Sequence, residues 1–283
     1  MSKIGIVIDS TVYLSAAQIE KHDLEVVSLN VLEGETVYLE TDLTPQFVFD
    51  GQDKGKRFTT SQPSPAAFKE AFEKKFAQGY EHIVCLVLSK GISGTYQSAL
   101  LGRDSLDDPK NVHVLDTENA GFGNELLALK LIELVSAEKP IKTVIDTMEK
   151  TIDNAGLFFT VENLFSLQKG GRLSRTQAFL GTVLRVKPII RLNDGKLQLV
   201  HKERTMKSLN RYIIKKIQED IGDKKHLVVR FVHQKSKESV DALIELINDV
   251  FDNVEYTVTD YIGPVFSIHI GRKGFGIAWY ALD

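Results

Sequence analysis

Two segments rich in hydroxyl side chains, residues 60–65 and 89–98, each lead into a predicted helix. In the first, Ser64 is a good N-cap, and the proline after it suits the first helical turn. In the second, Ser93 or Thr95 is a candidate N-cap for the helix that follows. These residue types are suited to binding an anion at the start of a helix.

A helix N-terminus presents unpaired N–H groups and the positive end of the helix dipole, and neighbouring hydroxyls add further donors. A carboxylate or a phosphate is the natural ligand of such a group. Plain capping explains either helix start alone. The two segments hold more hydroxyls than capping requires, so we predict that they are two halves of one anion-binding site.

Three charged or titratable side chains elsewhere are further candidates. His269 lies in the apolar segment 263–271, which we expect to be a strand, where a lone histidine is more often structural than a ligand. Arg172 follows two glycines, and a surface position explains it equally well. Arg204 opens a predicted helix, where a cation opposes the helix dipole. That unfavourable placement favours a functional role for Arg204, such as holding an anion.

Several common motifs are absent. Residues 51–57 have the wrong glycine spacing for a phosphate-binding loop, and residues 121–123 lack the third glycine of a dinucleotide-binding fingerprint. Residues 91–95 are one residue short of the G-x-S-x-G elbow of serine hydrolases. The seven histidines show no metal-ligand spacing. We therefore expect neither a metal nor a cofactor.

A serine hydrolase remains an alternative, because residues distant in sequence can meet in space. Ser93, His269 and Asp9 would then act as nucleophile, base and orienting carboxylate on an acyl or phosphate ester. A scattered trio of such common residues is weak evidence for this reading.

At 283 residues the chain is long for one hydrophobic core, which suggests two domains. The apolar fraction of 43% argues against disorder, and the net charge of −3 gives no sign of a nucleic-acid partner. The single Cys85 lies in an apolar run, so we expect a core residue in a reducing cytoplasm. No apolar run is long enough to span a bilayer, so we expect no transmembrane segment.

Residues 1–155 alternate apolar strand-like and helix-like segments, which predicts a mainly parallel sheet with helices on both faces, an α/β/α sandwich. Residues 33–59 are expected to be a polar connection with one short helix at 43–47. Ligands of such sheets sit beyond the carboxyl ends of the strands. Three predicted strands end there in polar residues: Asp9-Ser10-Thr11, Ser89 and Asp116-Thr117.

Residues 156–283 are predicted to form a mixed α/β domain with antiparallel pairs. Asn193-Asp194-Gly195 is a strong hairpin turn signal between two strand-like segments. Ser174 is expected to cap a helix that runs to Leu180.

One ordered set of motifs along the whole chain resembles the DegV family of bacterial fatty-acid-binding proteins. The set is Asp9-Ser10, Thr60-Ser61-Gln62-Pro63-Ser64, Ser93-Gly94-Thr95-Tyr96-Gln97-Ser98, Asp116-Thr117 with Gly121 and Gly123, Gly170-Gly171-Arg172, Lys187-Pro188, and Gly263-Pro264 with His269.

The resemblance implies two α/β domains that hold a long-chain fatty acid, of palmitate, stearate or oleate type, between them. The acyl chain would lie in a buried apolar tunnel, and a protonated His269 would offset the carboxylate charge. The implied carboxylate ligands are Thr60, Ser61, Ser93 and His269. Secondary candidates for the head group or a docking face are Gly94, Thr95, Arg172 and Arg204.

The resemblance also implies a carrier without catalytic turnover of its own. Such a carrier presents its fatty acid to an ATP-dependent fatty acid kinase and delivers the acyl phosphate to phospholipid synthesis. A lipid-responsive regulatory module is a third reading. Lys90, Arg272 and Lys273 depart from the family pattern, and we expect them to add positive charge near the head group.

Overall fold

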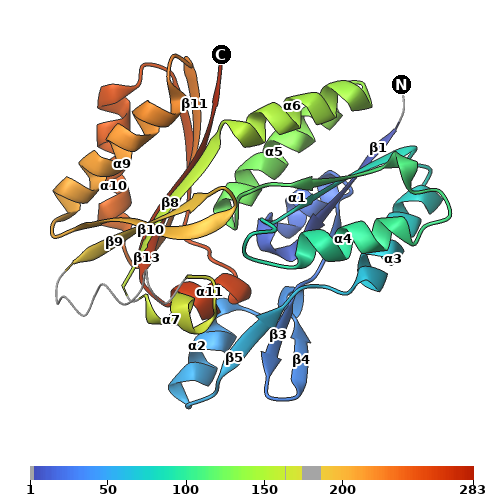
Figure 1. Ribbon diagram of the computed structural model, residues 1–283, viewed down its shortest axis with the longest axis horizontal. Coiled ribbons are helices and arrows are strands. Elements are labelled where there is room, and N and C mark those ends of the chain that lie inside the picture. The colour runs from blue at the N-terminus through green and yellow to red at the C-terminus, as the bar shows by residue number, and fades with distance from the viewer. Residues whose placement is uncertain (1–2, 163, 174–185) are drawn as a thin grey trace.

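The first of three sheets is parallel. The structure, a computed structural model, describes residues 3–162, 164–173 and 186–283 (Figure 1). The sheet has the order β2-β1-β6-β7 and consists of β1 (Ile4–Asp9), β2 (Glu25–Val27), β6 (His82–Val87) and β7 (Val112–Asp116). The parallel sheet predicted for the first half of the chain is thus confirmed.

The second sheet is small and antiparallel, with the order β4-β3-β5, and the third is mixed, with the order β10-β9-β8-β13-β11-β12. The small sheet consists of β3 (Asn30–Glu33), β4 (Thr36–Leu39) and β5 (Phe58–Ser61). The mixed sheet consists of β8 (Ala155–Val161), β9 (Lys187–Asn193), β10 (Lys196–Glu203), β11 (His226–Gln234), β12 (Val254–Thr259) and β13 (Gly274–Leu282). Only the β11–β12 pair is parallel among the described strand pairs of the mixed sheet.

The helices cover these sheets. They are α1 (Ala16–Lys21), α2 (Pro45–Asp53), α3 (Pro65–Ala77), α4 (Thr95–Asp104), α5 (Phe122–Ser136), α6 (Ile141–Asp153), α7 (Phe165–Lys169), α9 (Met206–Ile221), α10 (Lys237–Val250) and α11 (Pro264–Ile270), with short 3₁₀ turns η1 (Ser10–Val12), η2 (Glu40–Asp42) and η3 (Pro109–Asn111).

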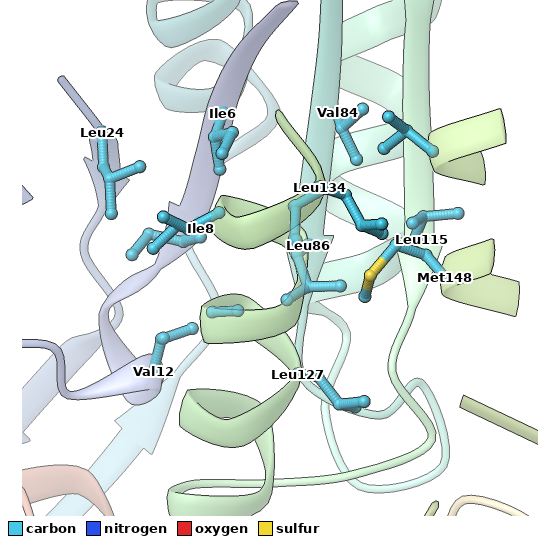
Figure 2. Packing of buried hydrophobic residues seen from close by; sticks show 14 of the residues in the cluster. Ile6, Ile8, Val12, Leu24, Val84, Leu86, Leu115, Leu127, Leu134 and Met148 are labelled. Carbon is cyan, nitrogen blue, oxygen red and sulfur yellow. The ribbon is translucent and has the colours of Figure 1, made fainter. Parts of the chain in front are cut away.

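The parallel sheet is buried on both faces, because alternate side chains of its apolar strands point to opposite sides. Val7 and Cys85 pack with α3 on one face. Ile8 and Leu86 face the other way, into a cluster with Leu127 of α5 and with α6 (Figure 2). Cys85 is a buried core residue, as expected.

Helices α5 and α6 lie between the parallel sheet and the mixed sheet (Figure 1). Helix α5 contacts β1 on one side and β11 and β13 on the other. Tyr280 of β13 belongs to the same apolar cluster as the parallel sheet. Helices α9 and α10 cover the far face of the mixed sheet. The order of layers is therefore helices, sheet, helices, sheet, helices.

The predicted hairpin at 193–195 is confirmed, with β9 and β10 antiparallel around it. Asp194 and Gly195 have φ values of 48° and 70°, as a type I′ turn requires. The predicted helix from Ser174 to Leu180 lies outside the described residues.

Two expectations about secondary structure are wrong. Residues 33–59 hold strand β4 and the longer helix α2 rather than a connection with one short helix. The strand β4 was missed because it is only four residues long, mostly exposed, and lies within a polar stretch. Residues 264–270 form helix α11, not a strand, and Pro264 occupies its first turn.

The division into domains at residues 155 and 156 stays a prediction. The parallel and small sheets use residues 4–116, and the mixed sheet uses residues 155–282. Among the described residues, no helix is long and apolar enough to cross a membrane.

Candidate functional site

A mainly apolar pocket lies between the mixed sheet, helix α11 and the carboxyl ends of the parallel strands. It holds about 970 Å³ of space between atoms, its opening to solvent included. Tyr13 lines it after β1, Leu88 after β6 and Gly121 after β7. The pocket therefore occupies the edge of the parallel sheet at which ligands of this fold class bind.

The pocket runs across the strands of the mixed sheet rather than along them. Its lining includes Leu197 of β10, Phe159 of β8, Gly274 of β13 and Val232 of β11. In the strand order, β10 and β11 are four strand spacings apart. At about 4.8 Å per spacing, the pocket crosses about 19 Å of sheet. An elongated ligand fits this shape better than a compact one.

Glycines in the central strand β13 make room on this face of the sheet. A Cβ atom on Gly276 would lie 2.4 Å from the ring of Phe122, which lines the pocket. A Cβ atom on Gly274 would lie 2.3 Å from the carbonyl oxygen of Thr160. Glycine at position 276 therefore lets the Phe122 ring approach the sheet closely, and glycine at position 274 lets β13 lie close to the backbone of β8.

Helix α11 presents one face to the pocket. The lining residues Ile262, Val265, Phe266, His269 and Ile270 recur at the spacing of a single helical face. His269 thus shares that face with apolar residues. The helix also contacts β5, which carries Thr60.

The polar side chains of the pocket gather near the C-terminal end of α11. His269 Nε2 and Thr60 Oγ1 are 2.9 Å apart. Arg172 follows α7 and donates from Nε to the carbonyl oxygen of Ile92 at 3.3 Å. Ser93 lines the same pocket, and its Oγ lies 2.8 Å from Thr95 Oγ1. The structure thus brings together Thr60, Ser93, Arg172 and His269.

Burial, followed by the nearby charge of Arg172, lowers the pKa of His269 to about 4. Burial therefore favours the neutral form of the His269 ring at pH 7, whereas the protonated histidine expected opposite a bound carboxylate stays a prediction. Burial also lowers the pKa of Arg172, but a guanidinium remains charged at neutral pH. Arg172 is the group that supplies positive charge to this end of the pocket.

The other four candidates do not line the pocket, although all four are described residues. Ser61 Oγ accepts a hydrogen bond from Asn30 Nδ2 at 3.1 Å. Gly94 lies beside the side chain of Gln62, and Thr95 is fully buried behind Ser93. Arg204 is exposed and directly precedes the N-cap of α9.

The two helix starts differ. Ser64 caps α3 as predicted, with Oγ accepting from Ala67 N at 3.2 Å. The N-cap of α4 is Gly94, so the prediction that Ser93 or Thr95 caps this helix is wrong. Because Ser93 is not a cap, its hydroxyl can face the pocket. The pocket takes one hydroxyl from each segment, from Thr60 and Ser93.

The polar residues that end the parallel strands hold loops together. Ser89 Oγ donates to Gly195 O at 2.6 Å, which docks the β9–β10 turn. Asp9 accepts from Thr11 N at 2.8 Å and from Leu88 N at 2.6 Å. His269 forms its hydrogen bond with Thr60, and Asp9 accepts from backbone groups. Within the described contacts, Ser93, His269 and Asp9 are therefore not linked as the triad of a hydrolase would be.

Of the three basic residues that depart from the family pattern, two form ion pairs with carboxylates. Lys90 Nζ lies 3.2 Å from Asp116 Oδ2. Arg272 binds both carboxylate oxygens of Asp53, at 2.7 and 3.1 Å. The expectation that they add charge near the head group is therefore wrong, because these carboxylates neutralise them. Lys273 does line the pocket.

Sequence reasoning missed the apolar lining and two residues of the wall, Tyr13 and Glu40. Tyr13 lines the pocket, and the buried Glu40 accepts hydrogen bonds from Tyr13 and from Val265 N in α11. Glu40 is one acidic residue within a polar stretch, so the sequence did not indicate that it is buried.

The fold and the pocket together define an α/β protein of three sheets with a mainly apolar pocket that suits an elongated ligand. The family model for DegV, described as "Uncharacterised protein, DegV family", matches residues 3–282. The chain therefore belongs to the DegV family.

Relatives and solved structures agree over nearly the full length. A DegV domain-containing protein of Staphylococcus aureus is 34% identical over 98% of both chains, and one of Listeria innocua is 31% identical over the same shares. A fatty-acid-binding DegV protein from Thermus thermophilus is 28% identical, with a TM-score of 0.87 over 99% of this chain and 100% of that one. DegV of Bacillus subtilis, a fatty acid binding protein, is 29% identical, with a TM-score of 0.83 over 100% of both chains.

Proposed function

We propose that the protein binds one long-chain fatty acid, with the carboxylate among Thr60, Ser93, Arg172 and His269. The observation that carries this proposal is that one pocket has both a polar part and an apolar lining. Thr60, Arg172 and His269 lie near the C-terminal end of α11, and most of the remaining lining is apolar. A fatty acid has the same division between a charged head and an apolar chain.

The head group would be held by neutral donors and one cation. With its proton on Nε2, His269 donates to Thr60 Oγ1, and the Thr60 hydroxyl is then free to donate to the carboxylate. Ser93 adds a second hydroxyl, and Arg172 offsets the negative charge. Ser61, Gly94 and Thr95 would support this set from behind rather than touch the ligand.

The acyl chain would supply most of the affinity. Burial contributes about 0.8 kcal/mol for each CH₂ group removed from water. Chains of palmitate, stearate or oleate type therefore fit the proposal. A stearic acid-binding protein from Eubacterium ventriosum is 26% identical to this chain, with a TM-score of 0.84.

The finer part of the proposal is that the protein acts as a cytoplasmic carrier and not as an enzyme. It would present the carboxylate to a fatty acid kinase, which transfers a phosphoryl group from ATP, and then carry the acyl phosphate to phospholipid synthesis. Arg172 stands at the polar end of the pocket and Arg204 is exposed. Both cations suit the growing charge of a phosphate.

Native mass spectrometry of the purified protein, followed by analysis of the released small molecule, tests the proposal. We expect one saturated or monounsaturated fatty acid for each chain. A protein that carries no fatty acid and takes up neither oleate nor palmitate would overturn it. Matched variants, His269→Ala in the pocket and His201→Ala outside it, separate specific binding from general adhesion of lipid.

A further inference from the structure

An aromatic cluster closes the end of the pocket that lies away from Arg172 and His269. The ring of Tyr13 meets the ring of Tyr261 edge-on, with centroids 5.7 Å apart, and the ring of Phe266 edge-on, with centroids 5.8 Å apart. All three rings line the pocket.

The positions of Tyr13 and Tyr261 place this cluster at the tail end of the proposed ligand. Tyr13 packs on Gly263 at the start of α11, whereas His269 is near the end of that helix. His269 is six residues after Gly263, which corresponds to about 9 Å of rise along the helix axis. Tyr261 follows β12, the edge strand opposite β10 in the mixed sheet. The cluster is thus displaced from the polar end both along α11 and across the sheet.

Tyr13 is held in one position by its backbone and its hydroxyl. Its φ of 57° lies in the left-handed region, which is rare for a bulky residue. Its hydroxyl donates to Glu40 Oε1 at 2.8 Å. A Cβ atom on Gly263 would lie 1.9 Å from the Tyr13 ring, so only glycine lets the ring pack there.

Glu40 joins this ring to the helix that lines the pocket. Its carboxylate also accepts from Ser10 Oγ at 2.5 Å and from Val265 N at 3.0 Å. The residue is only 3% exposed, and burying a carboxylate is costly unless donors surround it. Burial and the adjacent Glu40 raise the pKa of Tyr13 well above its usual value, so the hydroxyl keeps the proton that it donates.

Tyr261 differs from Tyr13 in exposure. Its side chain is 46% exposed, and its ring packs edge-on against the Tyr13 ring.

We propose that the Tyr13 ring is the end wall of the pocket and limits the length of the acyl chain, with Glu40 as the positioning residue that holds it. The inference rests on the proposed function. Removal of the ring opens space in line with the chain. Two more buried CH₂ groups contribute about 1.6 kcal/mol, or about tenfold in affinity.

The test is competition among saturated fatty acids of twelve to twenty-two carbons, offered in equal amounts and read by native mass spectrometry. Tyr13→Gly suits the left-handed backbone and removes the ring, and Tyr13→Leu is a second, smaller side chain should the first fold poorly. We expect either to raise the occupancy of the twenty-carbon acid relative to the eighteen-carbon acid, which has two fewer CH₂ groups, by about tenfold. Tyr13→Phe keeps the ring but loses its hydrogen bond to Glu40, so it should shift the ratio less than Tyr13→Gly and about as much as Glu40→Ala.

Glu40→Ala should shift the ratio in the direction of Tyr13→Gly, and Glu40→Gln, which keeps an acceptor, should restore it. A purely structural role for Glu40 would lower stability and leave the ratio unchanged. An unchanged ratio in folded Tyr13→Gly and Tyr13→Leu, with fatty acid still bound, would overturn the inference and leave the proposed function standing. Failure of the wild type itself to take up any of these acids would overturn the proposed function, and the inference with it.

Discussion

Thr60 Oγ1 and His269 Nε2 lie 2.9 Å apart, although 209 positions separate the two residues in the chain. The contact forms because α11 packs against β5, which carries Thr60. It joins the small antiparallel sheet to the helix that lines the pocket. The proposed carboxylate site therefore forms only when both segments have folded.

His269→Ala should weaken fatty-acid binding without unfolding the protein. In the proposed site His269 orients the Thr60 hydroxyl, and the hydrogen bond from Thr60 to the charged carboxylate contributes about 1.5–3 kcal/mol. We therefore expect a loss of about tenfold to a hundredfold in affinity. Displacement of a fluorescent fatty acid measures the affinity, and circular dichroism monitors the fold. Unchanged affinity would remove His269 from the site.

Gly170→Ala should lower the affinity through His269. A Cβ atom on Gly170 would lie 2.7 Å from His269 Nδ1, so the ring must move away from Thr60. The control is the double variant with His269→Ala, in which the added methyl group should cause no further loss. An equal loss in both backgrounds would show that Gly170 acts elsewhere.

Arg204→Ala should spare fatty-acid binding and impair its phosphorylation by a fatty acid kinase. Arg204 is exposed and outside the pocket, so the ligand keeps all its contacts. Acyl phosphate formed from bound oleate, ATP and purified kinase gives the readout. Normal formation of acyl phosphate with Arg204→Ala would contradict the proposal that Arg204 belongs to a docking face for the kinase.

Glu40→Gln should change how stability depends on pH. Burial raises the pKa of Glu40 to about 7, against the opposing effect of its hydrogen bonds with Ser10, Val265 and Tyr13. The folded protein therefore binds this proton more tightly than the unfolded chain. The stabilising contribution is full below pH 4.5 and is lost as the pH rises through about 7.

Urea titrations of both proteins at several pH values measure this effect. Between pH 5 and 8, the free energy of unfolding of Glu40→Gln should gain about 2 kcal/mol relative to the wild type. Glu125, whose pKa is also raised, and His269, whose pKa is lowered, act alike in both proteins and cancel in the difference. Asp9, whose pKa is raised to about 6, interacts with Glu40 and contributes to the difference. A difference that stays constant with pH would contradict the assignment.

The sequence predicts the parallel sheet well, because each of its strands is a short, continuous apolar run. It also predicts the cap at Ser64 and the turn at 193–195, where local chemistry dictates the conformation. Helix α11 was missed, because its seven residues are apolar on nearly all sides and too short to show a period.

The sequence indicates which residue types could form the candidate site, but it does not show which of these residues lie close together in the fold. Thr60 and Ser61 are adjacent hydroxyls, and only the pairing of β5 with β3 decides that Ser61 turns to Asn30. The neutral state of His269 depends on burial. The apolar lining has the same composition as a core, so no pattern separates the two.

Helix α5 packs against both the parallel sheet and the mixed sheet. Its Glu125 forms a buried ion pair with Arg230 of β11. Neither sheet has a complete core without this helix. A fragment that ends at residue 155 would expose the face of α5 that packs on the mixed sheet, and the remaining fragment would lose its cover on one side. The chain should consequently lose its structure in a single cooperative step rather than in two, so that the walls of the pocket form and melt together.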